Sequence, residues 1–311
     1  MALTHVLPAD RAEAPALLRV RFGAPGFAAR SGPQGLRLEI PVPCLAEEAS
    51  EAWGAPPVDA WGEDAGEAWA ASGHWLVSAL SAPADGDLEA EALGLYRRLL
   101  ARVAARSVHL YRVWNHVPRI NEGAGDAERY RLFNAGRARA LGEAWGAEAA
   151  VRYPAASAVG AEGNRLAMWA LAGPLPGTVV ENPRQVPAWA YPAAYGTRPP
   201  CFARALALPP EAGGAALISG TAAVLGHRTA HPGDTVAQLG VALDNLDAVR
   251  SALPGRFVPA ARKVYLRRAE EARAVREALA ADSPEVPVLA LRADICRGTL
   301  TVEIEETARP V

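Results

Sequence analysis

Cysteine is scarce in this chain of 311 residues. Cys44, Cys201 and Cys296 lie far apart, are odd in number and never form a C-x-x-C pair. This spacing excludes a disulfide framework and a zinc knuckle. A cysteine that matters to function therefore acts alone.

An excess of one charge and long apolar runs are also missing. The 32 basic and 34 acidic residues leave a net charge of -2, which argues against a nucleic-acid partner. The chain is repeatedly interrupted by 28 Gly and 26 Pro, and no apolar run approaches the roughly 20 residues that span a bilayer. Residues 1–11 lack the basic and apolar regions of a signal peptide. We therefore expect a cytoplasmic protein with no membrane partner.

Several common cofactor and nucleophile motifs do not occur. The Gly-rich dinucleotide fingerprint, the phosphate-binding P-loop and the Gly-x-Ser-x-Gly elbow are all absent. His227 and His231 have metal-ligand spacing only in a helix, but Pro232-Gly233 favours a loop that leads to Asp234 as a helix N-cap. We expect neither a metal nor an organic cofactor.

What the chain does contain is one order of elements that occurs twice. A helix at 88–103 has one apolar stripe and follows an alternating run at 68–80. The first half continues with a strand at 107–114, a helix at 126–145 and strands at 151–160 and 165–171. The second half repeats this order with a strand at 215–225, a helix at 234–253, a strand at 263–266, a helix at 268–281 and strands at 286–295 and 300–304. The fragments Ser72-Gly73 and Ser219-Gly220, each ahead of a long helix, also look alike. The pattern predicts a duplicated α+β module.

Residues 181–204 form a Pro-rich segment with several arginines and tyrosines. Tyr191, Tyr195, Arg198 and Arg204 belong to it. Arginine binds a carboxylate through two parallel hydrogen bonds, and tyrosine offers a flat face and a hydroxyl. The segment therefore suits an anionic, partly unsaturated ligand. A structured loop held by ion pairs is the alternative.

The helix before this segment carries further arginines. Arg131 and Arg137, with Glu128 nearby, suit a solvated helix face. An arginine on the side of Tyr130 and Phe133 would instead point to a buried role.

The last predicted strand ends in carboxylates. Alternation puts Glu303 and Glu305 on the face opposite Val302 and Ile304. If that face lines a cleft, loss of water raises the pKa of a carboxylate, as a general acid at neutral pH requires. The alternative is the exposed polar face of an edge strand.

Cys296 lies seven residues before Glu303, just ahead of an Arg297-Gly298 turn. A hairpin there would bring the two strands side by side. Most lone cysteines are small buried hydrophobes, so the thiol is a weaker candidate than the carboxylate.

Several separated motifs carry a family resemblance. They are Trp114-Asn115, Glu128-Arg129-Tyr130 with Phe133-Asn134, Glu181-Asn182-Pro183-Arg184-Gln185, Tyr191-Pro192, Ser219-Gly220-Thr221-Ala222 and His231-Pro232-Gly233-Asp234. In this order, across residues 68–308, they resemble the chorismatase family. That family resembles two fused modules of the RidA (YjgF) superfamily, each a mixed β-sheet packed on one face by two helices. The resemblance implies an N-terminal module at 1–172 with a divergent leading segment, and a C-terminal module at 173–311 that carries the catalytic Glu and Cys.

The resemblance also implies a substrate and its contacts. Chorismatases remove pyruvate from chorismate, a dianion that explains an arginine-rich pocket. By resemblance, Arg131 and Arg204 bind carboxylates, Tyr191 hydrogen-bonds the substrate, and Tyr195 and Arg198 lie close by. Chorismate is then the expected partner, with no cofactor, and the chain is a monomer or a homotrimer.

By the same resemblance, Glu303 protonates the enolpyruvyl methylene so that pyruvate can leave. Hydroxybenzoate-forming members carry a cysteine at the position of Cys296, where hydrolysing members tend to have an aliphatic residue. Ala222 points the other way, because a Gly there is typical of one group of 3-hydroxybenzoate producers and an Ala of hydrolases. The implied reaction yields 3-hydroxybenzoate and pyruvate by intramolecular displacement.

Three alternatives remain open. One is a hydrolase that gives 3,4-dihydroxycyclohexa-1,5-diene carboxylate, and another is a mixed 3-/4-hydroxybenzoate synthase. The third, outside chorismate chemistry, is a RidA-like protein that binds small acids or hydrolyses imines.

Overall fold

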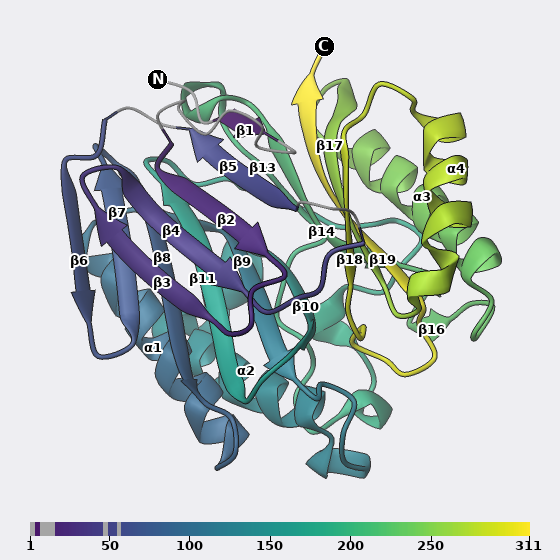
Figure 1. The fold of residues 1–311 in the computed structure, drawn as a ribbon, viewed down its shortest axis with the longest axis horizontal. Coiled ribbons are helices and arrows are strands. Elements are labelled where there is room, and N and C mark those ends of the chain that lie inside the picture. Colours follow the sequence, from purple (N-terminus) through teal and green to yellow (C-terminus); the bar gives the residue numbers. More distant parts are fainter. Residues whose placement is uncertain (1–3, 7–15, 46–48, 55–56) are drawn as a thin grey trace.

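The computed structural model describes residues 4–6, 16–45, 49–54 and 57–311 (Figure 1). Most of residues 1–11, over which the sequence shows no signal peptide, lies outside the described residues. Among the helices of the described residues, none is long and apolar enough to cross a membrane.

The first module is built on a six-stranded sheet. Its strands are β6 (Ala60–Asp64), β7 (Glu67–Ser72), β8 (Trp75–Pro83), β9 (His109–Pro118), β10 (Ala155–Ala161) and β11 (Arg165–Gly173). Two helices, α1 (Leu88–Ala105) and α2 (Arg129–Trp145), pack on one face of it through a shared apolar core. The side chain of Asp87 caps α1 by accepting a hydrogen bond from the Ala90 backbone N–H at 3.0 Å.

The second module repeats this design. Its strands are β12 (Thr178–Val180), β13 (Ala205–Ala207), β14 (Ala216–Ala222), β17 (Phe257–Leu266), β18 (Val288–Arg292) and β19 (Val302–Pro310). The helices α3 (Thr235–Ala252) and α4 (Ala272–Asp282) pack on one face. As predicted, Asp234 caps α3 after a loop, which contains the short hairpin β15 (Val224–Leu225) and β16 (Arg228–Thr229).

The two sheets have the same topology. The strand orders are β10-β9-β11-β8-β7-β6 and β12-β13-β14-β19-β17-β18, which match strand for strand when one is read backwards. In both sheets the strand pair that flanks the second helix, β9 with β10 and β17 with β18, is parallel. The predicted α+β fold of two modules, each with a mixed sheet and two helices on one face, is therefore confirmed.

Two details of the prediction are wrong. Ser72-Gly73 leads into the turn before β8, whereas Ser219-Gly220 lies inside β14, the counterpart of β8, so the two fragments are not equivalent. The strands β18 and β19 do not form a hairpin, because β17 lies between them. β19 instead pairs antiparallel with β14 on one side and β17 on the other, which leaves β18 at the edge of the sheet beyond β17.

The leading segment forms a third sheet, which the sequence analysis missed. Its order is β1-β5-β2-β4-β3, from the strands β1 (Thr4–Val6), β2 (Leu18–Phe22), β3 (Ala28–Gly32), β4 (Gly35–Ile40) and β5 (Ser50–Gly54). This sheet lies across the first module on the side away from α1 and α2 (Figure 1). One core joins it to both module sheets, through residues such as Leu38, Trp169 and Leu291. The helix-free faces of both modules are therefore buried.

Candidate active site

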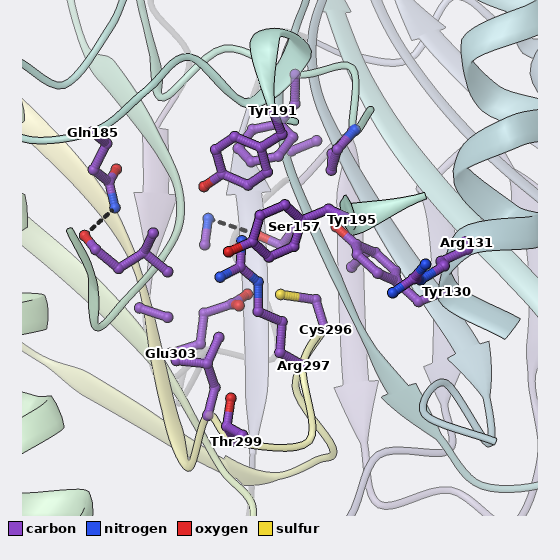
Figure 2. A pocket seen from close by; sticks show the side chains of 18 of the residues that line it. Tyr130, Arg131, Ser157, Gln185, Tyr191, Tyr195, Cys296, Arg297, Thr299 and Glu303 are labelled. Atoms are coloured by element: carbon purple, nitrogen blue, oxygen red, sulfur yellow. Dashed lines mark hydrogen bonds between the residues drawn. The ribbon is translucent and has the colours of Figure 1, made fainter. Parts of the chain in front are cut away.

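A cavity of about 290 Å³ lies where the two modules meet. Its walls come from α2 and β10 of the first module, from β14 and β19 of the second, and from the 181–204 segment (Figure 2). The volume lies just below the usual range for small-molecule sites, roughly 300–1,000 Å³. The Ala156 backbone N–H donates to Ser219 Oγ at 2.8 Å and so joins β10 to β14 beside the cavity.

Glu303 projects from β19 into this cavity (Figure 2). β19 is an inner strand, with Ala222 of β14 and Tyr265 of β17 as the register partners of Glu303. Val302 and Ile304 point to the helical core, as strand alternation predicts, so Glu303 faces the other module. Only 4% of Glu303 is exposed. The edge-strand alternative is therefore excluded.

The environment gives Glu303 and Glu305 opposite protonation states. Burial raises the pKa of Glu303 to about 8, and the negative charge of Glu305 adds to the effect, against Arg112 and Arg204. Burial alone would also raise the pKa of Glu305, but Lys263 and Arg112 lower it to about 2, with help from hydrogen bonds of Ser157 and Trp114. Two carboxyls whose pKa values are pushed apart are typical of acid-base sites. At neutral pH, Glu303 is an acid and Glu305 is an anion.

This difference predicts how activity depends on pH. A reaction that needs protonated Glu303 loses rate as pH rises through the pKa of about 8, because the raised pKa keeps the proton bound only below it. We expect kcat/KM to be flat around neutral pH and to fall about tenfold for each unit well above this pKa. A kcat/KM profile measured across this range checks it. A profile that rises through the same interval would assign Glu303 to the base form.

Three buried or half-buried arginines line the cavity without an ion-pair partner among the residues that the structure describes. They are Arg137, Arg204 and Arg297. Arg204 Nη2 donates to Tyr191 Oη at 2.8 Å and Arg137 Nη2 donates to Asn134 Oδ1 at 2.6 Å, while both Nε atoms are buried without a partner. Unpaired buried guanidinium groups have the charge and the free donors to bind a carboxylate.

Arg131 differs from these three. Its guanidinium forms ion pairs with Glu128 at 3.2 Å and Asp126 at 3.5 Å, and about a quarter of its side chain is exposed. Gly196 lies against its aliphatic stem. Arg131 still lines the cavity, on the side of α2.

Tyr191 and Tyr195 form an aromatic wall opposite Glu303 (Figure 2). Their ring centroids lie 5.4 Å apart, and Arg297 stacks on the Tyr195 ring at 4.3 Å. The Tyr195 hydroxyl and His227 Nδ1 share a hydrogen bond of 3.1 Å. These contacts fix a flat face next to the arginines, which suits an unsaturated anion.

Cys296 lies beside Glu303 although no hairpin joins their strands. The segment after β18 crosses back to the cavity and directs the sulfur into it (Figure 2). Burial raises the pKa of Cys296 to about 12. The thiol is therefore neutral and is neither a thiolate nucleophile nor a base at neutral pH.

The structure brings together most of the site residues that the sequence predicted. Glu303, Cys296, Arg131, Tyr191, Tyr195, Arg204 and Ala222 all line the cavity. Arg198 is exposed and is not among the lining residues.

The lining residues that the sequence prediction missed include Arg137, Arg297 and Ser157. Arg137 could have been found, because it follows Tyr130 and Phe133 on one helix face. Arg297 adjoins Cys296 in the sequence. Ser157 has no local signal, because only the packing of β10 against β14 places its Oγ 3.0 Å from the Gly220 backbone N–H.

Comparisons with known proteins agree with this site. Residues 51–172 match a family model described as "Chorismatase FkbO/Hyg5-like, N-terminal". The chain is 36% identical over 275 residues to a chorismatase of Streptomyces rapamycinicus, which covers 83% of this chain and 82% of that protein. A crystal structure of a chorismatase superposes with a TM-score of 0.88 at 32% identity, over 98% of both chains. The chain belongs to the chorismatase family.

Another member of the chorismatase family is similar over a shorter span. The chain is 43% identical over 213 residues to a 3-hydroxybenzoate synthase of Streptomyces hygroscopicus. This match covers 63% of the chain and 62% of the length of that relative. The family resemblance read from the sequence motifs is confirmed.

Proposed function

We propose that this protein converts chorismate to 3-hydroxybenzoate and pyruvate. The observation that carries the proposal is a buried, protonated Glu303 in a cavity whose arginines lack ion-pair partners among the described residues. Membership of the chorismatase family and the similarity to a 3-hydroxybenzoate synthase support it. In this proposal residues 173–311 form the catalytic module, and residues 1–172 supply the opposite wall.

The charge of the cavity fits a dianionic substrate. Chorismate carries a ring carboxylate and an enolpyruvyl carboxylate. Arg204 and Arg137 each have a buried Nε without a partner, and each is a donor for one of these groups. Arg131 and Tyr191 keep the substrate contacts that the family resemblance implies, and Tyr195 offers its face to the diene ring. Arg198, which is exposed and does not line the cavity, is given no contact.

The reaction begins with the acid. Glu303 gives its proton to the enolpyruvyl methylene carbon, and the adjacent ether carbon becomes cationic. The bond between the ring carbon and the ether oxygen then breaks, and its electron pair forms the ketone of pyruvate. The neighbouring ring hydroxyl bonds to the same ring carbon, gives its proton to the Glu303 carboxylate, and forms an epoxide.

Aromatisation completes the balance. The epoxide opens at its other carbon, the ring carbon that lost pyruvate releases its hydrogen as a proton, and the oxygen becomes the phenol of 3-hydroxybenzoate. Two protons are taken up and two are released, so Glu303 is restored without net consumption of water. The fixed geometry of the cavity favours this internal displacement.

Hydrolysis is the second candidate, because Ala222 stands where a Gly is typical of one group of 3-hydroxybenzoate producers. Ala222 is the register partner of Glu303, so its methyl group adjoins the acid. In that reaction water attacks the cationic ether carbon or the ring carbon, pyruvate leaves, and the diene diol is formed in place of the aromatic product.

The neutral thiol of Cys296 is expected to set the choice between these products. Cys296→Val should raise the ratio of diene diol to 3-hydroxybenzoate by about tenfold, since small changes in an apolar pocket shift selectivity on this scale. Chromatography against authentic standards measures the ratio. Cys44→Val, at a cysteine that does not line the cavity, is the matched control and should leave it unchanged. Equal ratios in both variants would remove Cys296 from product selection.

The proposal as a whole is tested with purified protein, chorismate and no added metal or cofactor. Pyruvate is followed with time, and the ring product is identified by chromatography. We expect 3-hydroxybenzoate and pyruvate in equal amounts. Binding of chorismate without release of pyruvate would overturn the proposal in favour of a RidA-like binding protein.

A further inference from the structure

Glu303 and Glu305 lie two residues apart on the same face of β19, yet only Glu305 is held by cations. Arg112 Nη2 lies 3.3 Å from Glu305 Oε2, and Lys263 Nζ lies 3.4 Å from the same oxygen. Trp114 Nε1 donates to Glu305 Oε2 at 2.8 Å, and the Tyr265 hydroxyl donates to Oε1 at 2.9 Å. Glu305 is 5% exposed and does not line the cavity, so it does not reach a ligand there.

Arg112 is the cation that could otherwise neutralise the acid. It reduces the pKa of Glu303 through its charge, but its guanidinium is directed elsewhere. Nη1 donates to the Ile218 carbonyl at 2.6 Å, and Nη2 donates to Ser157 Oγ at 2.8 Å beside its contact with Glu305. These three contacts leave Glu303 without an ion pair among the described residues.

Lys263 is balanced in the same way by the leading sheet. Its Nζ lies 2.7 Å from Glu51 Oε1, and Glu51 Oε2 in turn bonds His5 Nε2 at 3.0 Å. Burial lowers the pKa of His5, so this histidine is neutral at neutral pH. Arg112, Lys263, Glu305 and Glu51 therefore form a buried cluster with two positive and two negative charges.

We propose that Glu305 is a positioning residue, which keeps Glu303 in its acid form by binding Arg112 and Lys263 and completing a neutral cluster behind it. Without the Glu305 carboxylate, the cluster has a net positive charge next to Glu303, and Arg112 is free to pair with it. Glu303 then ionises and cannot deliver a proton. The inference rests on the proposed function, in which Glu303 is the acid.

Other groups also face Glu303, and none of them replaces Glu305. They are Arg112 from β9, Arg204 from the segment before β13, Cys296 from the segment after β18, Tyr130 from α2 and Tyr265 from β17. Burial raises the pKa values of Cys296, Tyr130 and Tyr265, so these three groups are neutral. Among the groups that act on Glu303, Glu305 is the anion.

Glu305→Gln tests the proposal because it keeps the shape and removes the charge. We expect the alkaline limb of kcat/KM to move to lower pH by about one unit or more, since a nearby cation shifts a carboxyl pKa by 1–3 units. Glu306→Gln is the matched control. Glu306 is a buried carboxylate on the opposite face of β19, paired with Arg250 at 2.6 Å and Arg262 at 2.9 Å. Removal of the Glu306 charge should leave the alkaline limb of kcat/KM at the wild-type pH.

Arg112→Met supplies the reverse change. Removal of this cation should move the limb to higher pH, and the double variant Glu305→Gln/Arg112→Met should return it toward the wild-type position. A purely structural role for Glu305 would lower activity equally at all pH values and give no such return. That result, or a limb that moves equally in Glu306→Gln, overturns the inference.

Infrared titration of the ligand-free protein separates this inference from the proposed function. The carbonyl band of protonated Glu303 is assigned by its loss in Glu303→Gln. It should disappear at lower pH in Glu305→Gln than in the wild type, whether or not chorismate is turned over. An unchanged titration contradicts the role of Glu305, whereas a shifted titration without pyruvate release contradicts only the proposed reaction.

Discussion

Glu303→Gln is expected to lower kcat for chorismate by about 100- to 10,000-fold, the usual contribution of a general acid. Glutamine matches the shape of the protonated carboxyl but has no acidic proton to give. Because burial raises the pKa of Glu303 to about 8, the wild-type side chain is uncharged at neutral pH, and the substitution leaves the cavity charge unchanged. Binding of chorismate and the melting temperature should therefore stay close to those of the wild type.

Single-turnover kinetics with calorimetric binding measurements checks this expectation. Retained binding with lost turnover identifies Glu303 as the acid. Activity within tenfold of the wild type would mean that the proton comes from another group, and loss of the fold would make the carboxyl a structural element.

Gly220→Ala should have the second-largest effect on activity, a loss of about 100-fold, because displacement of a reacting group by about 1 Å costs this much. A Cβ at Gly220 would lie 2.7 Å from Glu303 Cδ, closer than real Cβ contacts allow, and 3.0 Å from Ser157 Oγ, which is a tight contact. The end of the glutamate side chain can move aside, so the fold should persist while the acid leaves its position.

Gly298→Ala is the matched control for this substitution. Gly298 also lines the cavity, but a Cβ there meets nothing within 4 Å. Steady-state kinetics of the two variants should show the loss in Gly220→Ala alone. Equal activities would show that the position of Glu303 tolerates the methyl group.

The sequence could predict those parts of the fold and site that depend on local pattern. The apolar stripe of α1, the N-cap of α3 at Asp234 and the alternation that points Glu303 away from the helices are each contained in a few neighbouring residues. The duplication also follows, since each module repeats the same series of such patterns.

The leading sheet was missed, although Leu18, Val20 and Phe22 alternate with arginines in β2 and are buried as alternation predicts. Its pairing could not be predicted, because β1, β5, β2, β4 and β3 are neighbours in an order unlike that of the sequence. The link from Glu51 to Lys263 joins residues 212 apart and depends on three sheets that share one core. No pattern among neighbouring residues predicts such a contact.

The site shows the same division between local and long-range information. Tyr191, Tyr195 and Arg204 belong to one segment, so their composition indicated an anion site. Both arginines lie on α2, but among the described residues Arg131 has ion-pair partners and Arg137 has none, because of which acids the fold brings near each. Residue type alone therefore could not show which of the two arginines is the better ligand for a carboxylate.

The most direct test of the proposed reaction is the turnover of chorismate in ¹⁸O-labelled water, with mass spectrometry of the ring product. Internal displacement predicts 3-hydroxybenzoate with no solvent oxygen, formed in step with pyruvate and abolished in Glu303→Gln. A diene diol in place of 3-hydroxybenzoate would contradict this course; the diol carries solvent oxygen if water attacks the ring carbon and none if water adds to the cationic ether carbon. Absence of pyruvate would contradict the assignment of Glu303 as an acid that acts on chorismate.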